Sequence, residues 1–346
     1  MKLNQLLLTL LLLLSTTKIV AQTTQPFPIL FWNVENLFDC KHDSLKNDYD
    51  FLPESLKHWT EYRYKNKLKK ISKTIIASSQ WVPPAIIGLC EIENDTVIAH
   101  LTEKSLLRNL GYKYICTESK DSRGIDVTLI YQPERFKLIN YKAINVGRLP
   151  NGRLTRDILH AEGITLSGDT LDIYVAHFPS RFGGQRKSEP NRMHVAEVLR
   201  KEIDKIQFSK KGTAKIIVMG DFNDYPQNRC VQEVIKAVAP QKQHINTNLY
   251  HLLAKPRRKK EWGTYKYKNE WGVLDHFIVN GNLLNKDATF FTSEEQTEIL
   301  RIPFLLIKDE KYGGLKPFRT YNGMHYLNGY SDHLPIISTF TEVLDY

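Results

Sequence analysis

The sequence predicts a single α/β domain, and three observations carry that prediction. Short apolar runs have the length of buried strands and end on polar side chains, as residues 216–218 do before Asp221. Helices are predicted between some of these runs, at residues 60–75 from apolar residues at helical spacing and at residues 188–207 from a serine cap and an early proline. No linker rich in Gly, Ser or Pro divides the 346 residues, so we expect one domain after the N-terminal segment.

The N-terminal segment has the pattern of a secretory signal peptide. A lysine at position 2 precedes a leucine-rich run at residues 6–14, and the small residue Ala21 follows. A buried N-terminal helix would not need this order of charge, apolar run and small residue. We therefore expect a signal peptide at residues 1–21, a domain at residues 22–346, and a secreted or periplasmic protein. No other segment is apolar for long enough to cross a bilayer, so no stable membrane insertion is expected.

The first two predicted strands each end on a polar residue. Residues 29–38 form an apolar run around Asn33, whose amide must find a partner in the backbone, a metal or a phosphate. An amphipathic helix begins at Thr60. Residues 85–91 then form a second apolar strand that ends on Glu91, and an ionised carboxylate there is costly unless a positive group meets it.

The central strands continue this pattern. Residues 112–117 and 125–131 are predicted to pair, and β-rich segments cover 136–146 and 157–166, the latter preceded by Arg156. The next strand, residues 171–177, ends on His177, with Arg181 close behind. His177 is suited to phosphate chemistry or is an ordinary structural histidine, and the two arginines contact phosphate or form structural ion pairs. A helix is predicted from Ser188, a cap residue, with a proline two residues later.

The strand that ends in GDFND delivers Asp221 and Asn223 to a sheet edge, where Gly220 permits close backbone approach. Alone this pattern is more typical of turns and helix caps than of sites. A short helix is predicted at residues 229–239.

Two later motifs add titratable groups. The strand at residues 274–279 carries Asp275 near its start, and Asp332 and His333 precede the closing strand at residues 336–340.

The net charge of +10 favours an acidic partner such as nucleic acid, anionic lipid or polyphosphate, although a basic surface can simply be solvated. Residues 255–260 are basic, and Trp262, Tyr265, Tyr267 and Trp271 follow, as suits a phosphodiester backbone with stacked bases. The four cysteines are irregularly spaced, which argues against a CxxC metal site and leaves any disulfide pairing undetermined.

Together these residue types meet the needs of phosphoryl-ester cleavage. The reaction needs a cation, a base for water, donors for developing charge and help for the leaving oxygen. Hard oxygen ligands would come from Asn33, Glu91, Asp221 and Asp332. His333 would be the base, and Asp275 would orient it. Asn223 and His177 would donate hydrogen bonds to the phosphate and the leaving oxygen.

The ordered motifs WNVEN, GLCEIEN, HFPSR, GDFND, LDHF and SDHLP resemble the endonuclease/exonuclease/phosphatase superfamily, over about residues 27–342. The resemblance implies a four-layer α/β sandwich, in which two mainly antiparallel sheets pack face to face with helices outside. It also implies roles by position. Asn33, Glu91 and Asp332 would belong to the metal site, Asp221 and Asn223 would act at the nucleophile and the phosphate, Asp275 would pair with His333, and His177 matches the histidine of the deoxyribonuclease-like branch. We assign no chemical role to two segments, residues 123–127 and 316–321.

From these observations we expect a Mg²⁺-dependent phosphodiesterase, with Mn²⁺ or Ca²⁺ as alternatives. The expected substrate is nucleic acid, bound with help from Arg156 and Arg181, and the protein is expected to act as a monomer. The alternatives are a lipid-headgroup phosphodiesterase or phosphoinositide phosphatase on the same site, and a non-catalytic binding module. The last is disfavoured because no acid or histidine of the set is missing.

Overall fold

The computed structural model describes residues 22–79, 81–257 and 260–345. The predicted signal peptide, residues 1–21, lies outside this part of the chain. Among the described residues no helix is both long and apolar enough to span a membrane. The four cysteines at positions 40, 90, 116 and 230 are free thiols.

The first of two large sheets contains both ends of the described chain. Its order is β14-β20-β1-β2-β4-β3, and β15 also pairs with β20. The pairing of β1 with β2 is parallel and the other pairings are antiparallel. The strands are β1 (Gln22–Leu37), β2 (Ile86–Ile92), β3 (Lys113–Cys116), β4 (Asp126–Tyr131), β14 (Phe290–Phe291), β15 (Thr297–Ile299) and β20 (Ile336–Asp345).

The second large sheet has the order β5-β6-β7-β8-β13-β10-β9. It too is mainly antiparallel, with parallel pairing only of β7 with β8 and of β10 with β9. Its strands are β5 (Phe136–Ile144), β6 (Ile158–Thr165), β7 (Thr170–His177), β8 (Lys215–Asp221), β9 (Ala237–Val238), β10 (Leu249–His251) and β13 (Asp275–Asn280).

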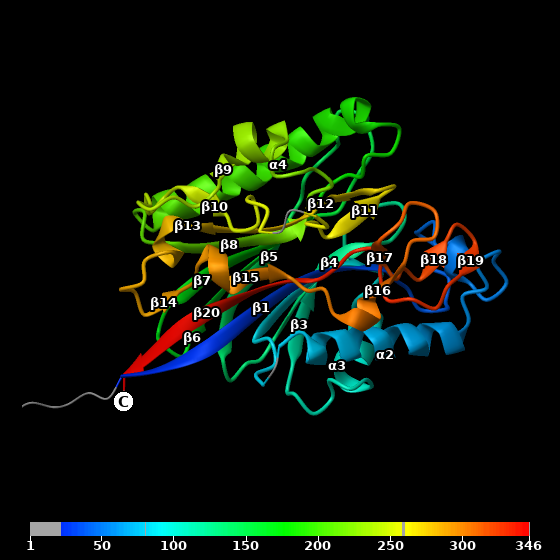
Figure 1. Cartoon of the computed structure of the whole chain (residues 1–346), viewed down its shortest axis with the longest axis horizontal. Helices are drawn as coiled ribbons and strands as arrows, with labels where there is room; N and C mark the ends of the chain where they lie inside the picture. The colour runs from blue at the N-terminus through cyan, green and yellow to red at the C-terminus, as the bar shows by residue number, and fades with distance from the viewer. Residues whose placement is uncertain (1–21, 80, 258–259, 346) are drawn as a thin grey trace, which may run out of the picture.

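Helices cover the outer faces of the two sheets. Helix α4 lies over the second sheet, whereas α2 and α3 lie beyond the first (Figure 1). This arrangement confirms the predicted four-layer sandwich. The helices are α2 (Glu61–Ala77), α3 (Asp95–Glu103) and α4 (Gln185–Ser209), and three two-stranded ribbons are β11 (Tyr265–Tyr267) with β12 (Glu270–Gly272), β16 (Leu306–Lys308) with β17 (Leu315–Pro317), and β18 (Tyr321–Asn322) with β19 (His325–Tyr326).

Two helix predictions need correction. Helix α4 begins at Gln185 rather than at Ser188, because the Ser188 hydroxyl donates to the Gly184 carbonyl 2.8 Å away inside the first turn and does not cap the helix. The short helix expected at residues 229–239 is a π-helical turn, Cys230–Ile235, which ends at Lys236 in the left-handed conformation and leads into β9.

Two glycines show how closely the layers pack. A Cβ on Gly88 of β2 would lie 2.8 Å from the Met219 side chain of β8, so the two sheets meet there with no spare room. A Cβ on Gly220 would lie 2.2 Å from the Ala176 carbonyl oxygen of β7. The predicted close backbone approach at Gly220 is therefore confirmed, and it brings the ends of β7 and β8 together.

Candidate active site

The polar strand ends of both sheets meet at one edge of the sandwich, and their backbone is irregular there. The register between β1 and β2 shifts after Asn33, and that between β2 and β4 shifts at Glu91. Glu35, Asn36 and Glu91 have φ values of 53°, 56° and 63°. Left-handed φ is uncommon for such residues and concentrates at functional sites, because the surrounding structure must hold it. Across this irregular backbone the Asn36 N–H donates to Glu91 Oε2 at 2.9 Å.

Asp221, at the end of β8, is the centre of the cluster. Its Oδ2 accepts from the Asn33 amide nitrogen at 3.0 Å and lies 3.6 Å from His177 Nε2 and 3.9 Å from His333 Nε2. The carboxylate is almost completely buried. Burial, together with the negative charge of Asp275, raises the pKa of Asp221 to about 7, although the neighbouring His333 opposes the rise.

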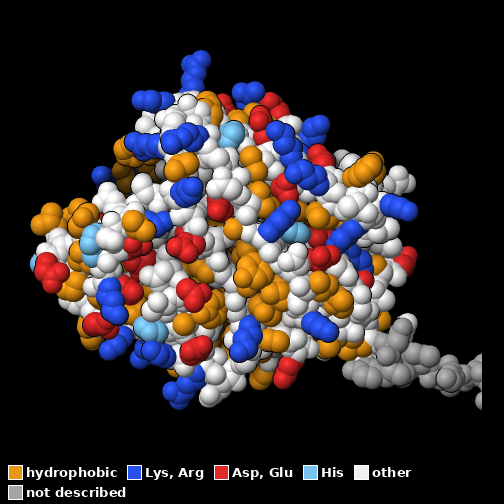
Figure 2. Space-filling model, turned by 180° about the vertical axis from the view of Figure 1, so that it is seen from behind, with side chains coloured by type: hydrophobic (Ala, Val, Ile, Leu, Met, Phe, Trp, Pro, Cys, Tyr) orange, Lys and Arg blue, Asp and Glu red, His pale blue; other side chains and the backbone are white. Residues whose placement is uncertain are grey.

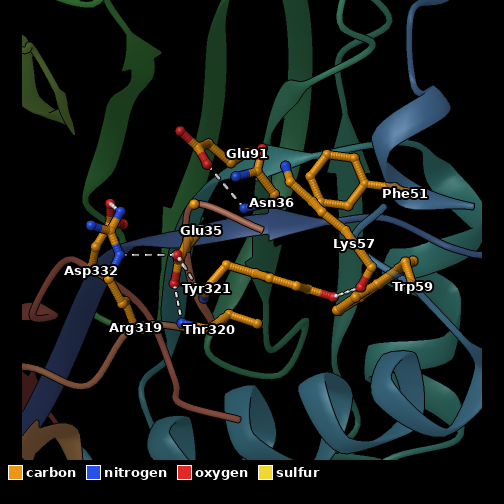
Figure 3. A pocket seen from close by; sticks show the side chains of 11 residues that line it. Glu35, Asn36, Phe51, Lys57, Trp59, Glu91, Arg319, Thr320, Tyr321 and Asp332 are labelled. Atoms are coloured by element: carbon orange, nitrogen blue, oxygen red, sulfur yellow. Dashed lines mark hydrogen bonds and ion pairs between the residues drawn. The ribbon is translucent and has the colours of Figure 1, made fainter. Parts of the chain in front are cut away.

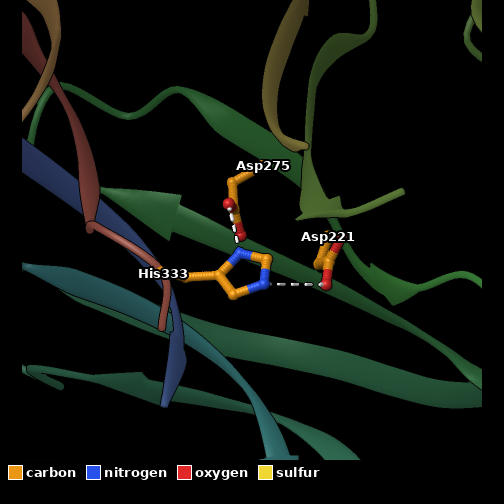
Figure 4. Close-up of side chains that lie close together, drawn as sticks. All are labelled: Asp221, Asp275 and His333. Carbon is orange, nitrogen blue, oxygen red and sulfur yellow. Dashed lines mark hydrogen bonds and ion pairs between the residues drawn. The ribbon is translucent and has the colours of Figure 1, made fainter. Parts of the chain in front are cut away.

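His333 and Asp275 form the predicted pair (Figure 4). His333 Nδ1 lies 2.7 Å from Asp275 Oδ2, which leaves Nε2 facing Asp221. The ring position is fixed further because the His333 N–H donates to Ser331 Oγ and the His333 carbonyl accepts from the Trp32 indole. Burial acts to lower the pKa of His333, but the carboxylates of Asp275 and Asp221 outweigh it and hold the pKa well above its usual value.

His177 has the opposite electrostatic environment. Burial and the nearby guanidinium groups of Arg156 and Arg123 hold the pKa of His177 well below its usual value, so its ring is neutral at pH 7. Its Nε2 lies 4.0 Å from Glu91 Oε1, and its buried Nδ1 has no hydrogen-bond partner among the described residues. Two histidines therefore lie near Asp221 Oδ2, His333 with a raised pKa and His177 with a lowered one.

Arg156 is a positioning residue in this structure. Its side chain is 4% exposed, and it donates to the carbonyl oxygens of His177 and Phe178 and to the Asp121 carboxylate. These contacts hold the backbone beneath His177, and the predicted substrate contact of Arg156 stays a prediction. The segment at residues 123–127, which received no chemistry from the sequence, supplies the adjoining loop.

Asn223 and Arg181 hold the loop that follows β8. Asn223 has a φ of 52°, its N–H donates to Asp221 Oδ1 at 2.8 Å, and its amide nitrogen lies 3.1 Å from the Phe178 carbonyl oxygen. Arg181 donates to the Asn223 carbonyl at 2.7 Å and pairs with Asp224 at 3.3 Å. The contacts of Arg181 with this loop are structural, and its predicted substrate contact stays a prediction, as does the phosphate contact of Asn223.

Asn33 and Asp332 are near the cluster but are held in ways that the sequence did not indicate. The Asn33 amide oxygen accepts from the Glu35 N–H at 3.0 Å, so the group that faces Asp221 and Glu91 is the amide nitrogen. Asp332 Oδ2 accepts from Arg319 Nη2 at 2.8 Å. A metal-ligand role for either residue stays a prediction.

Glu35 and Arg319 are two residues that the sequence interpretation missed. Glu35 accepts from the Thr320 N–H, and its Oε1 lies 3.6 Å from Arg319 Nε. Near them the Lys67 side chain is 2% exposed, and its ammonium donates to Thr320 and Tyr330. Arg319 and Thr320 lie in the segment at residues 316–321, and Glu35 lies in the motif WNVEN. The sequence analysis noted both segments but assigned no role to these residues.

The carboxylates offer a cation several oxygen atoms. Asp221, Asp275 and His333 have ligand atoms within 4.8 Å of one another, and Glu91 and Asp332 line the adjoining pocket. The buried Asp275 Oδ1 has no hydrogen-bond partner among the described residues. Clustered carboxylates of this kind fit a hard divalent cation, which would offset their mutual repulsion.

The basic aromatic loop has contacts within the protein, and its predicted contact with a phosphodiester backbone stays a prediction. Lys255 donates to the Pro240 carbonyl, the Arg257 guanidinium lies 5.7 Å from the Trp262 ring centroid, and the Arg301 guanidinium lies 4.4 Å from that of Trp271. These tryptophans therefore pair with the protein's own cations, while residues 258–259 of this loop are outside the described part of the chain.

A family model described as the Endonuclease/Exonuclease/phosphatase family matches residues 28–342. No curated protein sequence matches the chain. Among solved structures, it is similar to an endonuclease/exonuclease/phosphatase family protein from Bacteroides thetaiotaomicron, with a TM-score of 0.58 and 14% identity over 92% of this chain and 98% of that one.

Two further solved structures are similar in fold. A mannosyl-6-phosphatase from Bacteroides thetaiotaomicron has a TM-score of 0.56 and 14% identity over 92% of this chain and 99% of that one. TDP2 from D. rerio, solved with a single-strand DNA product, has a TM-score of 0.53 and 17% identity over 91% of this chain and 99% of that one.

Proposed function

Because the chain belongs to the endonuclease/exonuclease/phosphatase family, a family of phosphoric ester hydrolases, we propose that it is a secreted or periplasmic divalent-metal-dependent phosphodiesterase acting on nucleic acid. The observation that carries this proposal is the relay from Asp275 through His333 toward Asp221, with the neutral His177 near the same Asp221 oxygen. Such a relay supplies an oriented proton acceptor beside a carboxylate that can position water.

In this proposal Asp275 holds His333 so that Nε2 faces the reacting water. Nε2 takes the proton as the oxygen attacks phosphorus, and the negative charge of Asp275 stabilises the imidazolium that results. Asp221, within 4 Å of both histidines, orients the water. His177, held neutral, donates a hydrogen bond to a phosphate oxygen or to the leaving oxygen, and Asn223 contributes a second donor.

Glu91 and Asp332 would hold the cation, and the Asn33 amide links Glu91 to Asp221. When bound, the cation neutralises the phosphate and favours the charge that builds up on its oxygens. Mg²⁺ suits an all-oxygen donor set, and Mn²⁺ or Ca²⁺ are the alternatives. The positive charge would also lower the pKa of His333, so that a larger fraction of this histidine could accept a proton at neutral pH.

The choice of nucleic acid rests on two supports. The chain has a net charge of +10, and one solved structure of similar fold carries a DNA product. On the face drawn in Figure 2, Lys and Arg side chains are spread among Asp and Glu side chains rather than gathered in one patch. The positive charge therefore favours long-range attraction of a polyanion more than binding along one continuous basic surface.

The first test measures hydrolysis of plasmid DNA, RNA, abasic duplex, sphingomyelin and inositol phosphates by the mature chain, with Mg²⁺ and with EDTA. We expect cleavage of nucleic acid that EDTA abolishes and added Mg²⁺ restores. Asp221→Ala and His333→Ala should each lower kcat by about 10²–10⁴, the range for loss of a general acid or base. Ala substitution of the exposed Lys65 serves as the control.

Each result of this test has a defined meaning. Turnover that is insensitive to EDTA, or full activity in both variants, would overturn the mechanism. Hydrolysis of lipid or inositol phosphate without hydrolysis of nucleic acid would replace the substrate class and keep the chemistry. Binding of nucleic acid with no turnover of any substrate would favour the non-catalytic module.

A further inference from the structure

Arg319 lies at the candidate active site but has no role in the mechanism proposed above. It lines a pocket of about 180 Å³ together with Asp332. Nearby is Tyr265, whose ring centroid lies 5.0 Å from that of His333. Burial and the charges of Asp332 and Asp221 raise the pKa of Tyr265 to about 12, and the Arg319 charge acts in the opposite direction. The guanidinium therefore belongs to the same charged cluster as the base and the predicted cation site.

Two carboxylates hold the Arg319 guanidinium on two of its edges (Figure 3). Nη2 donates to Asp332 Oδ2 at 2.8 Å, and Nε lies 3.6 Å from Glu35 Oε1. Glu35 is fixed in turn, because its Oε2 accepts from the Thr320 N–H at 2.6 Å. A planar guanidinium held in this way presents its remaining N–H groups in one direction. Arg319 is therefore oriented before a ligand arrives.

The third nitrogen of this guanidinium is left for a ligand. Nη1 makes no hydrogen bond with any described residue, and the Arg319 side chain is 37% exposed. By contrast, Arg156 and Arg192, which form ion pairs inside the protein, are only 4% and 0% exposed. A fixed guanidinium with free N–H groups at the surface of a pocket suits a ligand with several acceptor oxygens, and its planar fork matches a phosphate.

The contact of Arg319 with Asp332 is compatible with a cation on the same carboxylate. Arg319 engages Asp332 Oδ2, whereas Oδ1 has no hydrogen-bond partner among the described residues. A carboxylate can serve two positive groups through its two oxygens. When a cation is bound at Glu91 and Asp332, it offsets their negative charge, and Arg319 remains protonated beside it. The positive charge that meets a phosphate here is therefore larger with the cation than without it.

Other contacts hold the backbone around Arg319. The Lys67 ammonium, on α2, donates to Thr320 Oγ1 at 2.6 Å and to the Tyr330 carbonyl oxygen at 2.7 Å. The Tyr330 N–H donates to the Phe318 carbonyl oxygen at 2.5 Å. These contacts fix the segment independently of the guanidinium, which is therefore available to a ligand.

We propose that Arg319 is a further catalytic residue, whose free guanidinium N–H groups bind a non-bridging oxygen of the reacting phosphate. The inference rests on the proposed function, because it supposes that phosphorus reacts between the predicted cation site and His333. In that position the guanidinium stabilises the negative charge that builds up on the phosphate oxygens as water attacks. Because the two carboxylates already orient it, little reorganisation is needed when the charge develops.

The test combines turnover with two binding measurements. Arg319→Gln removes the charge, and Arg319→Lys keeps the charge but lacks the planar fork. The matched control is Arg229→Gln, which removes an exposed guanidinium that lies 3.0 Å from Glu233. For each protein, kcat and KM are measured on bis(p-nitrophenyl) phosphate with Mg²⁺. Calorimetric titration gives the Kd of Mg²⁺ without substrate and the Kd of inorganic phosphate in the presence of Mg²⁺, and thermal unfolding shows that each variant is folded.

Under the proposal, Arg319→Gln lowers kcat/KM by about 10²–10³, the range for loss of one donor to a developing oxyanion. It also weakens the binding of inorganic phosphate at least about tenfold, as for a lost hydrogen bond between charged groups. The Kd of Mg²⁺ stays the same or falls, because a positive charge beside Asp332 has been removed. Arg319→Lys recovers part of the loss in kcat/KM, and Arg229→Gln changes none of these quantities.

Several other outcomes would contradict the inference or the proposed function. A rise in the Kd of Mg²⁺ as large as the loss of kcat/KM would show that Arg319 only positions Asp332, and would overturn the phosphate contact. Unchanged kcat/KM and phosphate binding in Arg319→Gln would overturn the contact, while the phosphodiesterase stands. If the folded wild type hydrolyses no ester but Arg319→Gln still weakens phosphate binding, the proposed function is overturned and the contact stands. If the wild type neither hydrolyses an ester nor binds phosphate, both are overturned.

Discussion

The Asp221 carboxylate lies near Asn33, Asn223, His177 and His333. All four were candidate site residues in the sequence analysis. The conjunction of Asp221 with Asn223, Asp275 and His333 could be anticipated because each follows or begins an apolar strand. The orientation of Asn33 could not be anticipated. Its amide nitrogen faces Asp221 because its oxygen is occupied by the Glu35 N–H, and that contact depends on a bulge that no hydrophobic pattern marks.

At this scale we predict the effect of Asp275→Asn. The substitution removes the charge that raises the pKa of His333, and the new amide can donate to Nδ1, which favours the tautomer with a proton on Nε2. We expect kcat/KM to fall by about 10²–10⁴, as when an orienting carboxylate is lost from a histidine pair. The measurement is the pH profile of kcat/KM on bis(p-nitrophenyl) phosphate with Mg²⁺.

The matched control for this substitution is Asp287→Asn, at an exposed position. The pKa that reports His333 should be lower in Asp275→Asn than in the wild type, because a negative neighbour has been removed. A profile that keeps the rate and pKa of the wild type would show that Asp275 does not act through His333.

At the scale of elements, the loop after β8 depends on α4, which the sequence placed three residues too late. Arg192, on α4, is fully buried, and its Nε lies 2.8 Å from Asp224 Oδ2. Asp224 also pairs with Arg181, which donates to the Asn223 carbonyl. The helix therefore anchors the loop that carries Asn223. Sequence periodicity marks Arg192 as one more charge on a long helix, and gives no sign that it faces inward.

We predict that Arg192→Leu strongly destabilises the protein. Removing one partner of a buried ion pair costs about 3–5 kcal/mol. Arg181 still pairs with Asp224 at 3.3 Å, so we expect a loss toward the lower end of this range. The free energy of unfolding is measured by urea titration at pH 7.5. Arg186→Leu, at an exposed position on the first turn of the same helix, should leave that free energy nearly unchanged. Equal losses in the two variants would mean that the contact between Arg192 and Asp224 contributes little.

For the whole molecule, the residues alone predicted one α/β domain with strands ending on polar groups, and the resemblance supplied the sandwich. Strand order could not be derived from the pattern, because parallel neighbours such as β1 and β2 are joined through α2 rather than through a turn. Contacts between side chains from separate motifs could not be predicted from the sequence pattern either. Arg319 meets Asp332 and Glu35, residues that belong to separate motifs.

One such distant contact links β10, β13 and the loop after β8, and it fixes the tautomers of two buried histidines. The Leu253 N–H donates to His251 Nδ1 at 3.1 Å, so His251 Nε2 carries the proton that it donates to His276 Nδ1 at 2.7 Å. His276 Nε2 then donates to the Asp224 carbonyl oxygen at 2.9 Å. Both rings are neutral and fully buried. Burial lowers the pKa of His276 to about 4 and holds that of His251 well below its usual value.

These histidines should weaken the fold in acid. Above pH 6.5 they are neutral in both the folded and the unfolded chain, so their contribution is fully present. As the pH falls from 6.5 toward 4, the unfolded chain takes up protons that folded His276 does not, and the free energy of unfolding falls by roughly 3 kcal/mol for this residue. Asp221 acts in the opposite direction, because its raised pKa adds stability at low pH that is lost as the pH rises through about 7.

The comparison that isolates the histidines is therefore between the wild type and His251→Gln, in which both carry the same Asp221. Urea unfolding at pH 7, 6, 5 and 4.5 should show a shallower loss of stability toward acid in His251→Gln, because one histidine no longer takes up a proton on unfolding. His325→Gln, at an exposed position, should keep the slope of the wild type. Parallel slopes in all three proteins, or NMR titration of His276 near pH 6.5 in the folded state, would mean that this buried chain accepts protons without unfolding.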